Sequence, residues 1–194
     1  MYAQMCKLLV DKAPNFDPPD SNACTFKRLL LNKCRVEFEN RVQIAQQYEK
    51  YASDMEEDAK YMAKRKMLGN IKFMGELGKL EIVHDTILHR CCEQLLVGRK
   101  KQPISDQAED LECLCHLIRT CGKNLDTTVG KVRMDQYFDR LSKVVANENM
   151  PVRIRFMIQD LIDMRRNKWQ ARRIGKSNFQ FRIPPLDGSC LPVS

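Results

Sequence analysis

The residues best suited to metal or covalent chemistry are the three histidines and nine cysteines of the 194-residue chain. His84, His89, Cys91 and Cys92 lie close together in one stretch that reads as a helix. On such a helix His84 and Cys91 share a side while the other two point elsewhere, whereas zinc requires four converging ligands, usually from two chain segments. We therefore predict no metal site and no cofactor.

The cysteines indicate reduced thiols with a structural role. Their number is odd, no CxxC motif occurs, and most lie in the apolar stripes of predicted helices, as small hydrophobic residues do. Burial raises the pKa of a thiol and weakens it as a nucleophile. A Cys–His pair assembled from distant segments stays open, but Gly69, Gly75 and Gly78 match no phosphate-binding fingerprint. The sequence favours a protein that is not an enzyme.

A surplus of positive charge points to binding instead. The net charge of +8 favours a partner that carries negative charge, such as nucleic acid or an acidic protein surface. One basic group recurs every seven residues along a predicted helix, and a second, which includes a tryptophan, lies near the C-terminus. Basic side chains interleaved with aromatic rings suit single-stranded RNA, although a solvated helix face has a similar pattern. The candidate RNA-binding residues are Arg65, Lys72, Lys79, Arg165, Arg166, Lys168, Trp169, Arg172 and Arg173.

Phe156 is the residue whose position suggests a docking surface for a protein. Residues 151–169 predict one amphipathic helix that Pro151 opens, with a core stripe along one side and Phe156 on the opposite, charged side. Large aromatic rings on a charged face are typical anchors for partners. Alternatively, the helix is sandwiched and the ring contacts a second neighbour. The stripe consists of Ile154, Met157, Ile158, Leu161 and Met164, and the charged side of Arg153, Asp160 and Asp163.

About seven helices must position these groups, and no segment alternates as a strand does, so the predicted fold class is all-α. Short polar loops predict antiparallel neighbours, and three helix pairs of similar size suggest a HEAT-like α-solenoid, although weak self-similarity also permits a bundle. In the helix over 106–121, Glu112, His116 and Arg119 lie opposite the apolar stripe. The expected helices are Met1–Lys12 and residues 25–51, 54–80, 84–97, 106–121, 127–145 and 152–166.

Local signals predict where these helices begin and end. We expect Thr25, Ser53 and Asp126 as N-terminal caps and Gly98 and Gly122 as C-terminal stops. The first helix has an apolar side that predicts a partner helix. No apolar run approaches the roughly 18 residues of a membrane span, and the N-terminus lacks the pattern of a signal peptide. We therefore expect an intracellular protein, in the cytoplasm and without membrane contact.

Four long strings resemble, in order and spacing, the middle domain of the translation initiation factor 4G family: MLGNIKFMGELGKL, AEDLECLCHLIRTCGKNLD, RMDQYFDRL and VRIRFMIQDLIDMRRNKW. The similarity runs from about Met1 to Arg173, and Gly78 before Lys79 with the basic insert at 99–101 resembles the death-associated protein five type. This resemblance implies a HEAT solenoid of five repeats with about three further helices before Met1. We therefore expect residues 1–169 to form a partial middle domain without its early repeats, and residues 170–194 to form a basic, proline-containing flexible tail.

The resemblance also implies partners: the DEAD-box helicase initiation factor 4A, initiation factor 3 and RNA. The expected function is a non-enzymatic scaffold of translation initiation; an RNA-binding helical platform in messenger-RNA decay or nuclear cap binding is the alternative. Phe138 lies on the apolar stripe of its own helix, so we expect it to be a core residue first and a contact second. The implied helicase-binding residues are Phe73, Phe138, Arg153, Arg155 and Phe156, to which the helical wheel adds Asp160 and Asp163.

Overall fold

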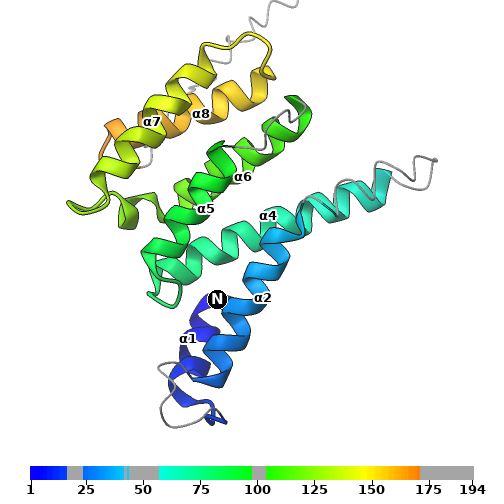
Figure 1. The fold of residues 1–194 in the computed structure, drawn as a ribbon, viewed down its shortest axis with the longest axis vertical. Helices are drawn as coiled ribbons and strands as arrows, with labels where there is room; N and C mark the ends of the chain where they lie inside the picture. Colours follow the sequence, from blue (N-terminus) through cyan, green and yellow to red (C-terminus); the bar gives the residue numbers. More distant parts are fainter. Residues whose placement is uncertain (17–23, 42, 44–56, 98–103, 171–194) are drawn as a thin grey trace, which may run out of the picture.

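The computed structural model describes residues 1–16, 24–41, 43, 57–97 and 104–170, and this part of the chain contains helices and no strands. The prediction of an all-α fold is confirmed. The helices, labelled in Figure 1, are α1 (Tyr2–Lys12), α2 (Thr25–Glu39), α4 (Glu57–Lys79), α5 (Asp85–Val97), α6 (Ile104–Leu125), α7 (Lys131–Val145) and α8 (Val152–Arg166).

The helices follow one another along the long axis of the molecule, from α1 and α2 at one end to α7 and α8 at the other (Figure 1). Helix α6 packs against α4 on one side and against α8 on the other. Helix α5 packs against α6, and α7 packs against α8 and α5. Helices α4, α6 and α8 therefore form one row, and α5 and α7 form part of a second row. Stacked pairs of this kind confirm the HEAT-like solenoid.

Helix α6 lies at the centre of the core, and its sequence explains why. Leucine, isoleucine, cysteine and one glycine are distributed around most of its circumference, which is typical of a helix with neighbours on several sides. Leu114, Leu117, Ile118, Cys113 and Cys121 have no measurable exposure. Its burial makes α6 the element on which both rows depend.

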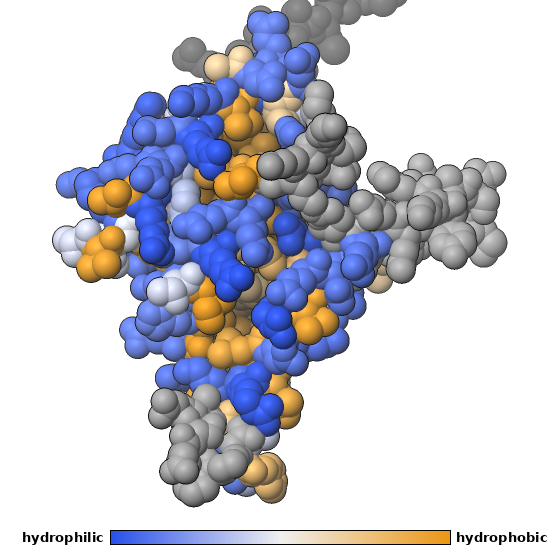
Figure 2. Space-filling model, viewed as in Figure 1, coloured by the Kyte–Doolittle hydropathy of each residue, from blue (hydrophilic) through white to orange (hydrophobic). Residues whose placement is uncertain are grey.

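The outward side of α1 remains exposed, and Figure 2 shows hydrophobic side chains at the end of the molecule where α1 and α2 lie. Only Ala3 and Cys6 of this helix are buried. The exposed side consists of Tyr2, Met5, Leu8 and Leu9.

Two predicted N-terminal caps are wrong. Cys24 caps α2, since its Sγ accepts a hydrogen bond from the backbone N–H of Lys27 at 3.4 Å, while the hydroxyl of Thr25 donates to Asn15 Oδ1 at 3.0 Å. Gly130 precedes α7, because the carboxylate of Asp126 is committed to tertiary contacts described below. Both predictions failed because the side chains of Thr25 and Asp126 bond to residues outside the first turn of the helix.

Gly122 does not end its helix, which continues to Leu125. The glycine is buried where the indole ring of Trp169 crosses α6, and a Cβ atom at this position would overlap that ring. Gly75 has a similar role, since its missing Cβ admits Thr120 of α6. These helical glycines therefore allow a side chain of another segment to pack against the helix backbone, and they do not end the helix.

Several predictions concern residues that the structure does not describe. The cap at Ser53, the stop at Gly98, the basic insert at 99–101 and most of the predicted helix beyond Glu39 lie outside the described residues. So does the tail at 171–194.

We predict opposite effects for two glycine-to-alanine substitutions in helices. Gly122→Ala should lower the free energy of unfolding by about 1–3 kcal/mol, because the new methyl group displaces the Trp169 ring. Gly69→Ala should raise it by about 0.5–1 kcal/mol, because nothing lies within 4 Å of the added atom and alanine favours the helix. Chemical denaturation of both variants measures the difference, and a stabilised Gly122→Ala protein would contradict the proposed contact.

Candidate functional site

The row of helices α4, α6 and α8 presents a charged surface that carries six of the sixteen predicted contact residues. We call it the α4/α6/α8 face. Ion pairs join the three helices on this side: Lys64 of α4 and Arg153 of α8 both bind Glu112 of α6, and Arg119 of α6 lies 3.9 Å from Asp160 of α8. The face consists of Lys64, Arg65, Lys72 and Lys79 from α4, Glu112, His116 and Arg119 from α6, and Arg153, Phe156 and Asp160 from α8.

Glu112 is a buried carboxylate beneath this face. Only 2% of its side chain is exposed, and it accepts hydrogen bonds from Lys64 Nζ at 2.9 Å and from both terminal nitrogens of Arg153. Burial alone would raise its pKa, but the hydrogen bonds from Arg153 and Lys64 outweigh burial and lower the pKa to about 2. One charge therefore joins α4 and α8 through α6.

Phe156 lies on the outer side of α8 with 68% of its surface exposed. The position given by the helical wheel is confirmed, and the alternative of a sandwiched helix does not hold for the described residues. Next to it in the same row, Asp160 lies 3.9 Å from the guanidinium of Arg119, and both side chains are largely exposed. The docking role of this ring stays a prediction.

The other residues suggested by the resemblance are less available to a partner. Phe138 is 7% exposed and belongs to the core, while Phe73 is half-buried against it. Arg155 is half-buried as well, and its Nε is buried without a hydrogen-bond partner among the described residues. Asp163 accepts a hydrogen bond from Gln159 at 3.2 Å. The helicase prediction thus concentrates on Phe156, Arg153 and Asp160.

A second ionic cluster fixes the end of α8. The guanidinium of Arg165 binds Asp126 at 2.8 and 2.9 Å and Asp135 at 2.6 Å, and lies over the ring of Phe138 at 4.6 Å. The indole nitrogen of Trp169 donates to Asp126 at 3.0 Å. The hydrogen bond from Arg165, with the one from Trp169, lowers the pKa of Asp126. These contacts occupy two predicted RNA-binding side chains within the fold.

The remaining predicted RNA-binding residues differ in position. Arg65, Lys72 and Lys79 are exposed on one side of α4, as their spacing predicts, and Lys79 pairs with Glu76 at 2.8 Å. Arg166 and Lys168 are exposed beyond the second cluster, whereas Arg172 and Arg173 lie outside the described residues. Lys64 and Glu112 were missed as site residues. Only the presence of an acid within a string of leucines and cysteines could have indicated the buried charge.

Five buried thiols are poor nucleophiles. Burial raises the pKa of Cys34 and Cys91 to about 11 and that of Cys113, Cys115 and Cys121 to about 12. No group of three or more histidine, cysteine or acidic side chains that could hold a metal ion occurs in the described ranges. Nor is any helix of that part long and apolar enough to cross a membrane.

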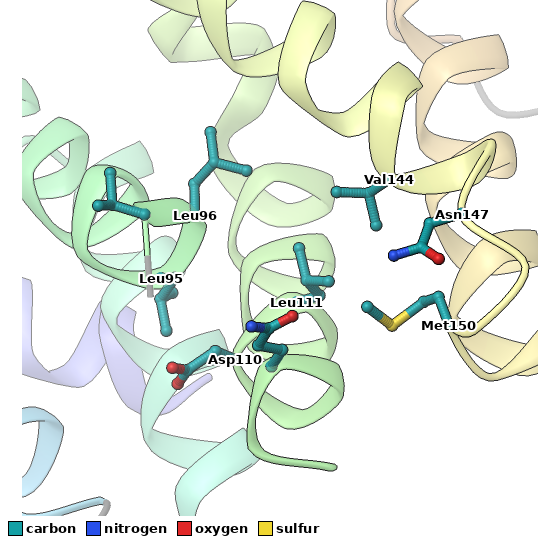
Figure 3. Close-up of a pocket in the computed structure, with 9 residues that line it drawn as sticks. Leu95, Leu96, Asp110, Leu111, Val144, Asn147 and Met150 are labelled. Atoms are coloured by element: carbon teal, nitrogen blue, oxygen red, sulfur yellow. The ribbon is translucent and has the colours of Figure 1, made fainter. Parts of the chain in front are cut away.

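A pocket of about 150 Å³ lies away from the α4/α6/α8 face, between the ends of α5 and α7 and the start of α6 (Figure 3). Leu96 and Val144 face each other across it, and Asn147 and Met150 project into it. Asp110 lines it too, but its carboxylate is bound to Arg41 at 3.1 Å. This lining contains no arrangement of a nucleophile and a base.

Stacked helix pairs around one core define a helical-repeat domain of the HEAT type. Comparison with known proteins agrees with this class. A family model described as the MIF4G domain matches residues 1–168. The chain is 44% identical to human eukaryotic translation initiation factor 4 gamma 2 over 183 residues, which cover 89% of this chain and 20% of the relative.

Two further relatives are similar over the same share of the chain. Human eukaryotic translation initiation factor 4 gamma 3 is 41% identical and the mouse factor 4 gamma 1 is 38% identical, each over 188 residues that make up 89% of this chain and 11% of the relative. The chain belongs to the MIF4G domain family, and its relatives are translation initiation factors of the 4 gamma group. It spans no more than a fifth of their length.

We predict that Glu112→Gln lowers the free energy of unfolding by about 2–3 kcal/mol at neutral pH, because it removes the charge that Lys64 and Arg153 neutralise. The pKa of Glu112 is lowered from 4.5 to about 2 in the folded state, so its contribution is complete above pH 4.5 and is lost as the pH falls towards 2. Denaturation curves of wild type and variant should therefore converge in acid.

Glu76→Gln is the matched control for this prediction. It removes a carboxylate that pairs with Lys79 at the surface of α4, where both side chains are more than 40% exposed. The change in unfolding free energy should stay below about 0.5 kcal/mol. Equal losses in the two variants would show that burial of Glu112 has no energetic consequence.

Proposed function

We propose that this chain is a non-enzymatic scaffold of translation initiation that binds the DEAD-box RNA helicase initiation factor 4A and RNA. The observation that carries the proposal is the exposure of Phe156 beside Arg153 and Asp160 on the α4/α6/α8 face. A large ring in water recovers about 1.5–3 kcal/mol when a partner buries it, and charged neighbours then set which partner fits. The family membership supports a role in translation initiation.

The proposed mechanism makes and breaks no covalent bond. A rigid surface contacts both lobes of the helicase and raises the population of its closed state, by no more than the difference in affinity for the two states. Rigidity is required because a deformable scaffold would bind both states equally well. The ion pairs that Lys64 and Arg153 form with the buried carboxylate of Glu112 support such rigidity, because they link α4 and α8 to α6.

The same proposal includes a second protein partner, initiation factor 3, and action in the cytoplasm. Within the initiation factor 4G family, we assign the chain to the death-associated protein five type. The identity of 44% with factor 4 gamma 2, against 41% and 38% with factors 4 gamma 3 and 4 gamma 1, supports that branch.

The second candidate is an RNA platform that acts in messenger-RNA decay or nuclear cap binding. The exposed basic side chains of Arg65 and Lys72 favour it, since they suit a nucleic acid as well as an acidic protein. Capture of purified initiation factor 4A on the immobilised chain, with and without nuclease, separates the two. A scaffold retains the helicase after nuclease treatment, whereas a platform that holds it through RNA loses it.

We predict that Phe156→Ala weakens helicase binding by about 30-fold, the loss typical of an aromatic anchor, and leaves the free energy of unfolding within about 0.5 kcal/mol of wild type. Titration calorimetry and thermal unfolding measure the two quantities. Val132→Ala is the matched control, because this exposed aliphatic side chain lies on α7 outside the α4/α6/α8 face. If Phe156→Ala binds the helicase like wild type, this face is not the docking surface.

A further inference from the structure

His116 lies on α6 in the middle of the α4/α6/α8 face, and no part of the proposed function uses it. Its ring is half-buried, and neither ring nitrogen forms a hydrogen bond with another described residue. Lys72 lies on α4 between Lys64, which binds Glu112, and Gly75, which packs against Thr120, so it faces the part of α6 that contains His116. Arg119 follows His116 by three residues on the same side of α6. Arg153 of α8 binds Glu112, one turn before His116. An anion bound next to this imidazole could accept a hydrogen bond from the ring and also contact the neighbouring cationic side chains.

The acidic groups around His116 do not cancel this charge. Glu112 is buried and already shared between Lys64 and Arg153. Asp160 is exposed and 3.9 Å from Arg119, a distance at which an exposed pair contributes little. Lys72 forms no ion pair with any described residue. Burial, with the charges of Lys72, Arg119 and Arg153, lowers the pKa of His116 and thus favours the neutral ring in the absence of an anion.

We propose that Lys72, His116 and Arg119 form a phosphate subsite for single-stranded RNA, in which His116 takes up a proton when a backbone phosphate binds. A phosphate placed against the ring accepts a hydrogen bond from the imidazolium and offsets the repulsion from the neighbouring cations. Proton uptake then couples RNA affinity to pH, because binding and protonation favour each other. The choice of RNA rests on the proposed function.

The arrangement of charge favours a polyanionic strand over an isolated carboxylate. Arg65 and Lys79 lie on either side of Lys72 along α4, each about 10 Å away by the rise of the helix. A chain with a charge on every repeat unit can reach all three cations and release counterions at each. An acidic peptide has carboxylates in place of phosphates, and the experiment below tests it directly.

The test is fluorescence anisotropy of a labelled 12-residue oligouridylate with the full chain at pH 7.5 and pH 6.0, at constant ionic strength. The affinity of the wild type should rise about threefold or more on acidification, within the limit of tenfold per pH unit for one proton. His116→Gln should bind with the same affinity at both pH values. His116→Arg should bind at pH 7.5 as tightly as the wild type binds at pH 6.0.

His84→Gln is the matched control, because His84 is exposed and, within the described residues, its ring bonds to Thr86 at the start of α5. This variant should keep the pH dependence of the wild type. The proposal is overturned if His116→Gln keeps that dependence, if no oligouridylate binds, or if a 12-residue polyglutamate gains as much on acidification. Helicase capture by the same protein samples reports on the scaffold function separately.

Discussion

The need to neutralise one buried carboxylate governs the α4/α6/α8 face. An unpaired charge at the position of Glu112 would cost several kcal/mol, and the cations that offset this cost come from two other helices. Lys64 and Arg153 must therefore stay within reach of the same side chain. This requirement fixes the sliding of α4 and α8 along α6, and with it the separation between the basic side of α4 and the ring of Phe156.

The helices could be predicted from sequence because each buries a stripe that its own periodicity defines. Some helix ends could not be predicted, because the residue with the local cap or stop chemistry interacts with a distant residue instead. Asp126 has the chemistry of a cap, but Arg165 and Trp169 bind its carboxylate. Gly122 has the chemistry of a stop, but its lack of a side chain is used to admit the Trp169 ring. Both partners lie about forty residues further along the chain and are invisible to a local pattern.

The site shows the same division. The exposure of Phe156 could be predicted because a single helix decides it. Glu112 was expected on the outer side of its helix, opposite the apolar stripe, yet its side chain is almost completely buried and binds Lys64 and Arg153. Arg165 and Trp169 fit an RNA-binding pattern by composition and are nonetheless held by Asp126 and, for Arg165, Asp135. Charge in a sequence shows what a side chain can bind, while only the fold shows whether that capacity is already used.

The buried cysteines can serve as probes of local unfolding along the solenoid. Cysteines lie in α1 and α2 at one end and in α5 and α6 at the centre, while α4, α7 and α8 contain none. A repeat protein can open one unit at a time, since each unit contacts only its neighbours. The order in which a thiol reagent modifies Cys6, Cys34, Cys92 and Cys121 would therefore record whether the molecule frays from its first helices inward or opens as a whole.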